Sequence, residues 1–179
     1  MGYWTSRGLR GSALESIINF TNEFYRQKNL AVIQKIPTPI TPVEVDNKKR
    51  TITLAYFDAQ STVDYIGMAQ GVGICFDAKE TGLKSLPIQN IHEHQIEFME
   101  EFEKQGGVAF LLVHFSAVGK YYFLSMKILK EFWIGAKKGE RKSIPLSAFK
   151  PEYEILTKGS GIINYLEAIN TYLVEKEKK

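Results

Sequence analysis

Four segments of the chain carry apolar residues at the three- and four-residue spacing of an amphipathic helix, and we expect helices over residues 12–27, 87–104, 126–137 and 162–174. In the first segment Ser12 and Glu15 have the spacing of a capping box, which predicts a helix start at Ser12. In the second segment Gln95 interrupts an apolar stripe. A buried amide needs a hydrogen-bond partner, which would be either neighbouring backbone or a polar site.

Between these segments lie short runs rich in β-branched and aromatic residues, and we expect strands over residues 31–36, 43–45, 51–56, 61–66, 72–78, 108–115 and 121–124. Pro37, Pro39 and Pro42 remove three backbone donors, so their segment must be an edge strand, an extended arm or a loop. We interpret residues 37–56 as a hairpin insertion that projects from the core. The order of elements predicts a mixed α/β domain with a central sheet flanked by helices.

Composition fits one globular domain over residues 1–179, with 44% hydrophobic and 24% charged residues. The apolar runs are too short to cross a bilayer, and no secretory signal is visible. The single cysteine, Cys75, fits a reducing compartment, so we expect a cytoplasmic protein without a membrane partner. Residues 175–179 are all charged, and we expect this tail to fray.

Basic residues gather in three places although the net charge is only +3. They are Arg7 and Arg10, then Lys48–Arg50 at the hairpin tip, and then Lys137–Lys138 with Arg141–Lys142. Each cluster alone could be a solvated loop. Together with an acidic site they favour a polyanionic substrate such as DNA.

The acidic site is predicted from Asp64, Asp77 and Lys79, which form the pattern D-x12-D-x-K on two adjacent expected strands. Carboxylates at the ends of neighbouring strands can hold a hard divalent cation through oxygen. Side chains alternate along a strand with period 2, so Lys79 shares the face of Asp77. A metal ion beside a fixed ammonium group suits phosphodiester hydrolysis.

A second possible metal pair is His92 and His94. In a helix these positions point about 200° apart, so we do not expect them to share an ion.

The segment order, with acids on strands and Glu15 on the preceding helix, resembles the core of the PD-(D/E)xK nuclease superfamily, a restriction-endonuclease-like fold. Several strings narrow the likeness to the RecU-type Holliday junction resolvases of Gram-positive bacteria and their phages. These strings are Gln34-Lys35-Ile36-Pro37-Thr38-Pro39, Ser61-Thr62-Val63-Asp64-Tyr65, Asp77-Ala78-Lys79-Glu80-Thr81, Gln89-Asn90-Ile91-His92-Glu93-His94-Gln95, Lys104-Gln105-Gly106-Gly107 and Arg141-Lys142-Ser143-Ile144.

The resemblance implies Mg²⁺ ligation, with Mn²⁺ as a substitute, by Thr62, Asp64, Asp77 and Gln95. It also implies that Lys79 stabilises the transition state. Thr62 lies two residues before Asp64, which would place both on one strand face. The family usually has glutamate at the position of Asp77, and the extension before the Arg-Gly element is shorter here than in many members.

The expected function is therefore a structure-selective endonuclease that resolves four-way DNA junctions in recombination and repair by paired symmetric nicks. Two symmetric cuts with one active site per chain imply a homodimer. The hairpin resembles the family's stalk, and Arg7, Arg10, Lys48–Arg50, Arg141 and Lys142 are the expected DNA contacts. Interaction with a RecA-type recombinase is implied by the resemblance alone. The alternatives are a nuclease of the same fold that cuts duplex DNA, and a non-catalytic junction-binding protein.

Overall fold

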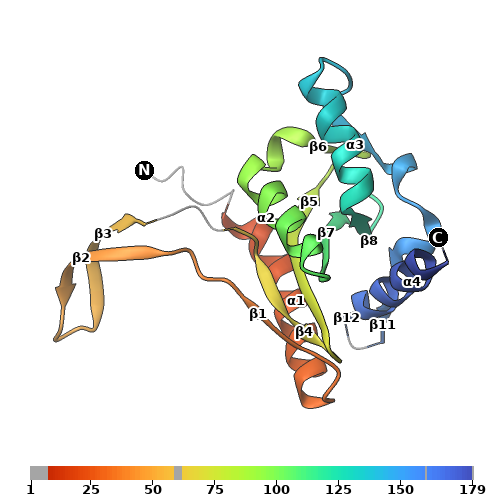
Figure 1. Cartoon of the computed structure of the whole chain (residues 1–179). Coiled ribbons are helices and arrows are strands. Elements are labelled where there is room, and N and C mark those ends of the chain that lie inside the picture. Colours follow the sequence, from red (N-terminus) through yellow and green to blue (C-terminus); the bar gives the residue numbers. More distant parts are fainter. Residues whose placement is uncertain (1–7, 59–61, 160, 179) are drawn as a thin grey trace.

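The computed structural model describes residues 8–58, 62–159 and 161–178, and its centre is a six-stranded sheet in the order β1-β4-β5-β7-β8-β10 (Figure 1). The strands are β1 Val32–Lys35, β4 Tyr65–Ala69, β5 Val72–Thr81, β7 Val108–Phe115, β8 Lys120–Ser125 and β10 Glu154–Ile155. Strands β5 and β7 run parallel, whereas the other neighbouring pairs in this sheet run antiparallel. The predicted mixed sheet is confirmed.

Helices cover both faces of this sheet and create two cores. They are α1 Gly8–Gln27, α2 Glu93–Lys104, α3 Met126–Lys137 and α4 Tyr165–Glu177. Phe76 and Phe110 pack with residues of α1 and α4 in the first core, while Cys75 and Leu111 pack with residues of α2 and α3 in the second. Strands β5 and β7 are buried on both faces, as expected for a parallel pair with nearly continuous apolar sequence. The fold class expected from the sequence is confirmed.

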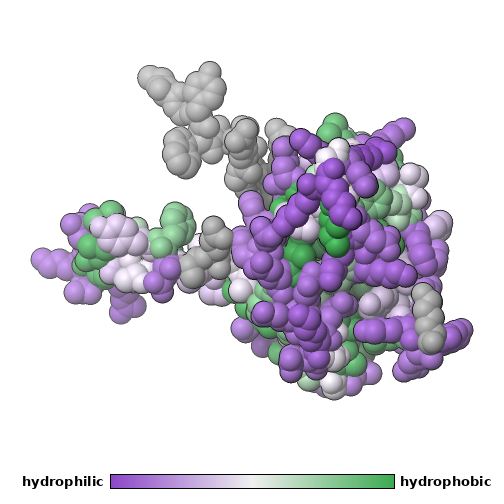
Figure 2. All heavy atoms as spheres, turned by 45° about the horizontal axis from the view of Figure 1, so that its top comes forward, coloured by the Kyte–Doolittle hydropathy of each residue, from purple (hydrophilic) through white to green (hydrophobic). Residues whose placement is uncertain are grey.

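The expected hairpin is present as a separate two-stranded sheet of β2 Ile40–Asp46 and β3 Thr51–Phe57. It extends away from the body of the molecule (Figures 1 and 2). Pro42 lies inside β2, beside a register shift between Pro42 and Glu44. Proline is tolerated there because both strands of a two-stranded sheet are edge strands, and a bulge needs fewer ladder bonds.

The sequence did not predict two short antiparallel ribbons. They are β6 Ser85–Pro87 with β9 Ser143–Pro145, and β11 Thr157–Lys158 with β12 Ile162–Ile163. Three 3₁₀ turns complete the elements, at Ile88–Asn90, Leu146–Ala148 and Pro151–Tyr153. These elements are two or three residues long, too short to show a hydrophobic period.

Several element boundaries differ from those expected. Helix α1 begins at Gly8, so Ser12 lies inside the helix and is not its N-cap. Strand β4 begins at Tyr65 rather than at residue 61, which leaves Thr62 and Asp64 before the strand. Helix α2 begins at Glu93, after a 3₁₀ turn.

The expected frayed tail is partly helical, because α4 continues to Glu177. Glu175 explains the extra turn, since its carboxylate accepts a hydrogen bond of 2.7 Å from the Tyr153 hydroxyl and lies 3.6 Å from the Lys150 ammonium. Charged residues at a chain end remain helical when such contacts tie them to the body.

Among the described residues, no helix combines the length and apolar character needed to span a membrane.

Gly67 on β4 is a position where the sheet has no room for a side chain. A Cβ atom there would lie 2.0 Å from Val32 O and 2.6 Å from Ile33 Cα on β1. We therefore expect Gly67→Ala to separate β1 from β4 and to lower the free energy of unfolding in urea by about 1–3 kcal/mol. Gly82→Ala is the matched control, because its Cβ would meet only Ser116 Oγ at 3.8 Å. Equal urea midpoints for the two variants would contradict this account.

Candidate active site

Asp64 and Asp77 face each other across the β4–β5 pair. The antiparallel register joins Tyr65 to Phe76, so the next pair outward is Asp64 and Asp77, with side chains on the same face. The backbone carbonyl of Asp64 accepts a 2.8 Å hydrogen bond from the Ile36 N–H, which extends the ladder beyond the end of β1. Asp64 Oδ2 accepts a 2.9 Å hydrogen bond from the Ala78 N–H. These bonds fix Asp64 although it precedes the strand.

Asp77 is fully buried, with 0% of its surface exposed, on the face of β5 that α2 covers. Its Oδ1 accepts a 2.8 Å hydrogen bond from Gln95 Nε2. Its Oδ2 contacts the Lys79 ammonium as an ion pair but accepts no well-formed hydrogen bond from any described residue. Asp77 Oδ2 is therefore a buried oxygen held by an ion pair rather than by a hydrogen bond.

Burial raises the pKa of Asp77 to about 7. The charge of Lys79 opposes this rise in pKa, whereas the charge of Asp64 and its contact with Asp77 add to it. The mutual influence of the two carboxyl groups shows that they converge on one small volume.

Gln95 links these groups through both ends of its amide. While Nε2 donates to Asp77, Oε1 accepts from the His92 N–H at 3.1 Å and from Lys79 Nζ at 3.4 Å. Gln95 is thus satisfied by neighbouring backbone and by the acidic site at once, so both partners weighed from the sequence are present. Because His92 immediately precedes α2, the same amide also closes the start of the helix.

Lys79 occupies the predicted position on the face of Asp77, two residues along β5. Its side chain is 16% exposed, and its ammonium lies between the Asp77 carboxylate and the Gln95 amide oxygen. A mostly buried cation with one carboxylate partner provides positive charge at the edge of the site.

The donor set fits a hard divalent cation such as Mg²⁺. Within the described ranges, no three His, Cys, Asp or Glu side chains gather in a metal-binding arrangement. Mg²⁺ does not need three, because proteins commonly hold it through one or two carboxylates while water and substrate phosphates complete its octahedron. Asp77 Oδ2, which has an ion pair but no hydrogen bond within the described residues, and the nearby Asp64 carboxylate are the oxygens that such a cation would contact.

Two further predicted site residues lie outside strands β4 and β5. Thr62 is exposed in the segment before β4, so the alternation of a strand does not place it on the face of Asp64. Glu15 lies on α1 and pairs with the Lys35 ammonium. Burial raises the pKa of the Tyr65 hydroxyl, and the charges of Glu15 and Asp64 raise it further, so both carboxylates lie near that hydroxyl.

The geometry expected for His92 and His94 is wrong. His92 has extended backbone and stands outside α2, so the helical angle between the two positions does not apply. Their rings stack with centroids 5.6 Å apart and an interplanar angle of 9°.

The expected DNA contacts lie in three regions. Lys48–Arg50 form the exposed hairpin tip, where Asp46 Oδ1 accepts hydrogen bonds from the Lys48 and Lys49 N–H groups. Arg141 and Lys142 are exposed between α3 and β9. Arg10 belongs to α1, and Arg7 lies outside the described residues.

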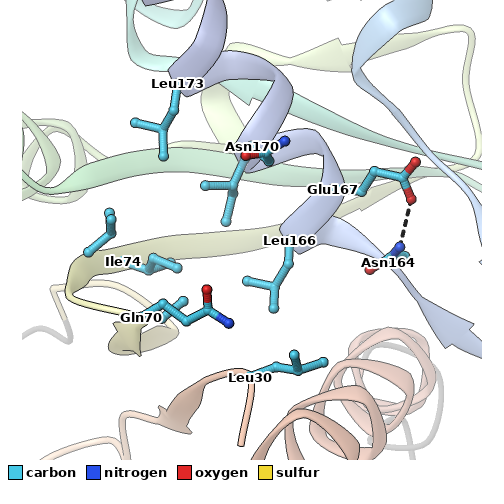
Figure 3. A pocket seen from close by; sticks show the side chains of 11 residues that line it. Leu30, Gln70, Ile74, Asn164, Leu166, Glu167, Asn170 and Leu173 are labelled. Carbon is cyan, nitrogen blue, oxygen red and sulfur yellow. Dashed lines mark hydrogen bonds between the residues drawn. The ribbon is translucent and has the colours of Figure 1, made fainter. Parts of the chain in front are cut away.

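A hollow of about 460 Å³ lies beside α4 and the β4–β5 turn, and its lining differs from that of the acidic cluster (Figure 3). Leu30, Leu166 and Leu173 line it, together with the Asn164–Glu167 hydrogen bond at its rim. It shares no lining residue with the acidic cluster and carries no basic group. Buried charge, rather than the size of a hollow, identifies the candidate active site.

Comparison with known proteins decides the family. Residues 9–171 match the family model described as RecU, Recombination protein U. The chain belongs to the RecU family.

RecU relatives resemble this chain over most of their length. The protein named Holliday junction resolvase RecU from Pediococcus pentosaceus is 44% identical over 168 residues, covering 91% of this chain and 84% of the relative. The same-named protein of Lactococcus lactis subsp. lactis is 46% identical, covering 91% and 78%. That of Oceanobacillus iheyensis is 45% identical, covering 82% and 77%.

Among solved structures, Archaeoglobus fulgidus Hjc, titled a Holliday junction resolvase from an archaeal hyperthermophile, is similar with a TM-score of 0.46 and 12% identity. The match covers 78% of this chain and 87% of that chain.

The raised pKa of Asp77 predicts a pH-dependent cost of folding in metal-free buffer. An aspartate in the unfolded chain titrates near pH 4, whereas Asp77 in the folded chain titrates at about 7. Between these values the folded chain holds the extra proton, so the free energy of unfolding falls as pH rises, and the cost is complete above pH 7. We expect Asp77→Asn to stabilise the protein at pH 8 and to change little at pH 4, measured by urea unfolding with EDTA. The exposed Asp58→Asn is the control, and a gain for Asp77→Asn that is equal at both pH values would contradict the burial argument.

Proposed function

We propose that this chain is an endonuclease that resolves four-way DNA junctions by paired, symmetric, Mg²⁺-dependent nicks. The observation that carries the proposal is the buried Asp77 carboxylate, which forms an ion pair with Lys79 and lies close to Asp64. A charge buried at this cost suits a catalytic site better than a purely binding surface. The names of the RecU relatives support four-way junctions as the substrate.

Asp64 and Asp77 would hold Mg²⁺, or Mn²⁺ in its place, with Thr62 and Gln95 as the further ligands expected from the family. When bound, the cation supplies positive charge that polarises the scissile phosphate and lowers the pKa of water. Gln95 holds Asp77 in place through Nε2. Its Oε1 would have to leave the His92 N–H to contact an ion directly.

Lys79 would stabilise the negative charge that develops on the phosphate during cleavage. Its ammonium is already held by Asp77 and Gln95, so little reorganisation is needed when substrate arrives. Glu15, on the neighbouring helix, completes the set of residues that we propose for catalysis.

The hairpin supports a homodimer as the working unit. A two-stranded hairpin alone is marginally stable in water, yet this one exposes large apolar side chains on both strands: Ile40, Val43, Val45, Ile52, Leu54, Tyr56 and Phe57. Val45 lies opposite Ile52, and Leu54 and Tyr56 follow on the same face of β3. A second hairpin packed against this apolar face would bury it and bring two active sites together.

The basic tip of each hairpin would then contact the phosphates at the junction centre, where it fixes position without reading sequence. Arg7, Arg10, Arg141 and Lys142 are the other proposed DNA contacts. A RecA-type recombinase as a further partner is supported only by the family resemblance.

Asp77→Asn tests the reaction. We expect it to lower Mg²⁺-dependent cutting of a labelled four-way junction by at least about a hundredfold, because the buried carboxylate that holds the cation is lost. Binding to the junction in Ca²⁺ should be unchanged or tighter, because a group that repels phosphate is removed.

Asp58→Asn, exposed and outside the site, should cut like the parent. Parent-like cutting by Asp77→Asn, or cutting that persists in EDTA, would refute the site. Nicks confined to one strand of the junction would refute paired resolution.

Two hairpin variants separate its proposed roles. Leu54→Asp should convert the dimer to a monomer in sedimentation, because a charge would enter the apolar interface. The combined change Lys48→Ala, Lys49→Ala and Arg50→Ala should leave a dimer but weaken junction binding more than duplex binding. A monomeric parent would contradict the dimer, and equal losses on both DNA substrates would contradict a junction-specific tip.

A further inference from the structure

A second, smaller hollow lies between the 3₁₀ turn at Ile88–Asn90, the C-terminal half of α3 and the loop that enters β9. Its volume is about 240 Å³, and it is lined by Ile88, Gln89, Trp133, Ala136, Lys137 and Lys142. The lining is mainly apolar, with two lysines in it. Of its lining residues, only Lys142 has a part in the proposed function, as a DNA contact.

The walls of the hollow are fixed by contacts that tie together three separate segments. The Ile88 N–H donates a 3.1 Å hydrogen bond to Lys142 O, and Pro87 pairs with Ser143 in the β6–β9 ribbon. On the other side, Lys137 of α3 forms an ion pair with Glu93, the first residue of α2. The hollow is therefore part of the folded framework and does not depend on a loose loop.

The indole of Trp133 is held in a defined orientation. Trp133 is half-buried and packs against the second core, and Lys137 Nζ lies 5.3 Å from the centre of its ring. The Lys137 side chain remains 53% exposed despite its contacts with Glu93 and the ring. An aromatic side chain with an adjacent accessible cation offers both stacking and charge to a ligand.

One continuous segment of the chain contributes residues both to the hollow and to the candidate active site. Ile88 and Gln89 line the hollow, and the segment then continues through His92 to Gln95, which bonds Asp77. Glu93, which contacts Lys137, is two residues from Gln95. A ligand that spans from the hollow to Asp77 would follow this segment.

Charge around the hollow favours an anionic ligand. Residues 137–142 contribute Lys137, Lys138, Arg141 and Lys142, whereas the acids beside them are Glu140 and Glu93, the ion-pair partner of Lys137. Lys138, Arg141 and Lys142 are exposed. A polyanion that also carries a planar apolar group matches an apolar hollow surrounded by cations better than a neutral ligand does.

We propose that this hollow receives a single unstacked nucleobase of the DNA strand that crosses the active site, with Trp133 as its stacking partner and Lys137 and Lys142 beside its phosphates. The proposal rests on the proposed function and names the part of the substrate that this site reads. An intact duplex keeps its bases stacked inside the helix, whereas a base in a single strand, or one left unpaired at an opened branch point, costs less to extrude. The hollow therefore favours branched or single-stranded DNA over continuous duplex.

The test uses Trp133 as a fluorescent reporter and as the substituted residue. In the full chain with Trp4→Phe, Trp133 is the remaining tryptophan, since the sequence has two. A single-stranded oligonucleotide and a four-way junction, each in Ca²⁺, should quench its emission, and a continuous duplex of equal length should quench it less. Stacking of one base on an aromatic ring is worth about 1–3 kcal/mol, which corresponds to a roughly 5- to 150-fold change in affinity. Trp133→Leu should therefore weaken junction binding by a factor in that range.

Trp133→Tyr keeps an aromatic ring and should retain most of the affinity that Trp133→Leu loses. Ile134→Ala is the matched control, because Ile134 is the next residue on α3, is 45% exposed and does not line the hollow. Circular dichroism and urea unfolding of each variant separate lost binding from lost folding.

Unquenched Trp133 emission, together with parent-like junction binding by Trp133→Leu, would overturn the proposal, and the hollow would then be open to a protein side chain instead. A parent that binds junction no better than duplex and does not cut, but is quenched by single-stranded DNA, would refute the proposed function and leave the base-binding hollow standing.

Discussion

The burial of one carboxylate, Asp77, on the central parallel strand pair is the constraint on which the rest of the site depends. A carboxylate without water must be compensated by nearby groups, and here Gln95 and Lys79 provide the compensation. Gln95 must therefore face the sheet, which fixes the start of α2, and α2 in turn closes the second core. The position of α2 and the burial of the Asp77 carboxylate therefore depend on each other through Gln95.

Local periodicity in the sequence was sufficient to predict which side chains of the candidate site lie close together. Asp77 and Lys79 share a face because side chains alternate along a strand, and Asp64 meets Asp77 because β4 and β5 are joined by a tight turn at Gln70–Gly71. Gln95 stood out because a polar residue interrupted an apolar stripe. Each inference needed only the spacing of residues close together in the chain.

The features of the site that the sequence did not predict depend on the exact boundaries of helices and strands and on contacts of backbone groups. Thr62 was assigned to a strand that begins only at Tyr65, and the stacking of His92 on His94 depends on a helix that starts one residue after His92. The Ala78 and His92 N–H groups that hold the site carry no side-chain signal. The hollow at Trp133 joins segments more than forty residues apart, so no local pattern marks it.

The Ile36–Asp64 hydrogen bond also has a mechanical consequence. It joins the two stems of the hairpin at the point where they leave the main sheet, and its acceptor is the backbone carbonyl of Asp64, whose side chain belongs to the acidic cluster. A force applied to the arm would therefore reach the backbone of Asp64 through this hydrogen bond. The hairpin arm and the acidic cluster are thus connected at one residue, Asp64.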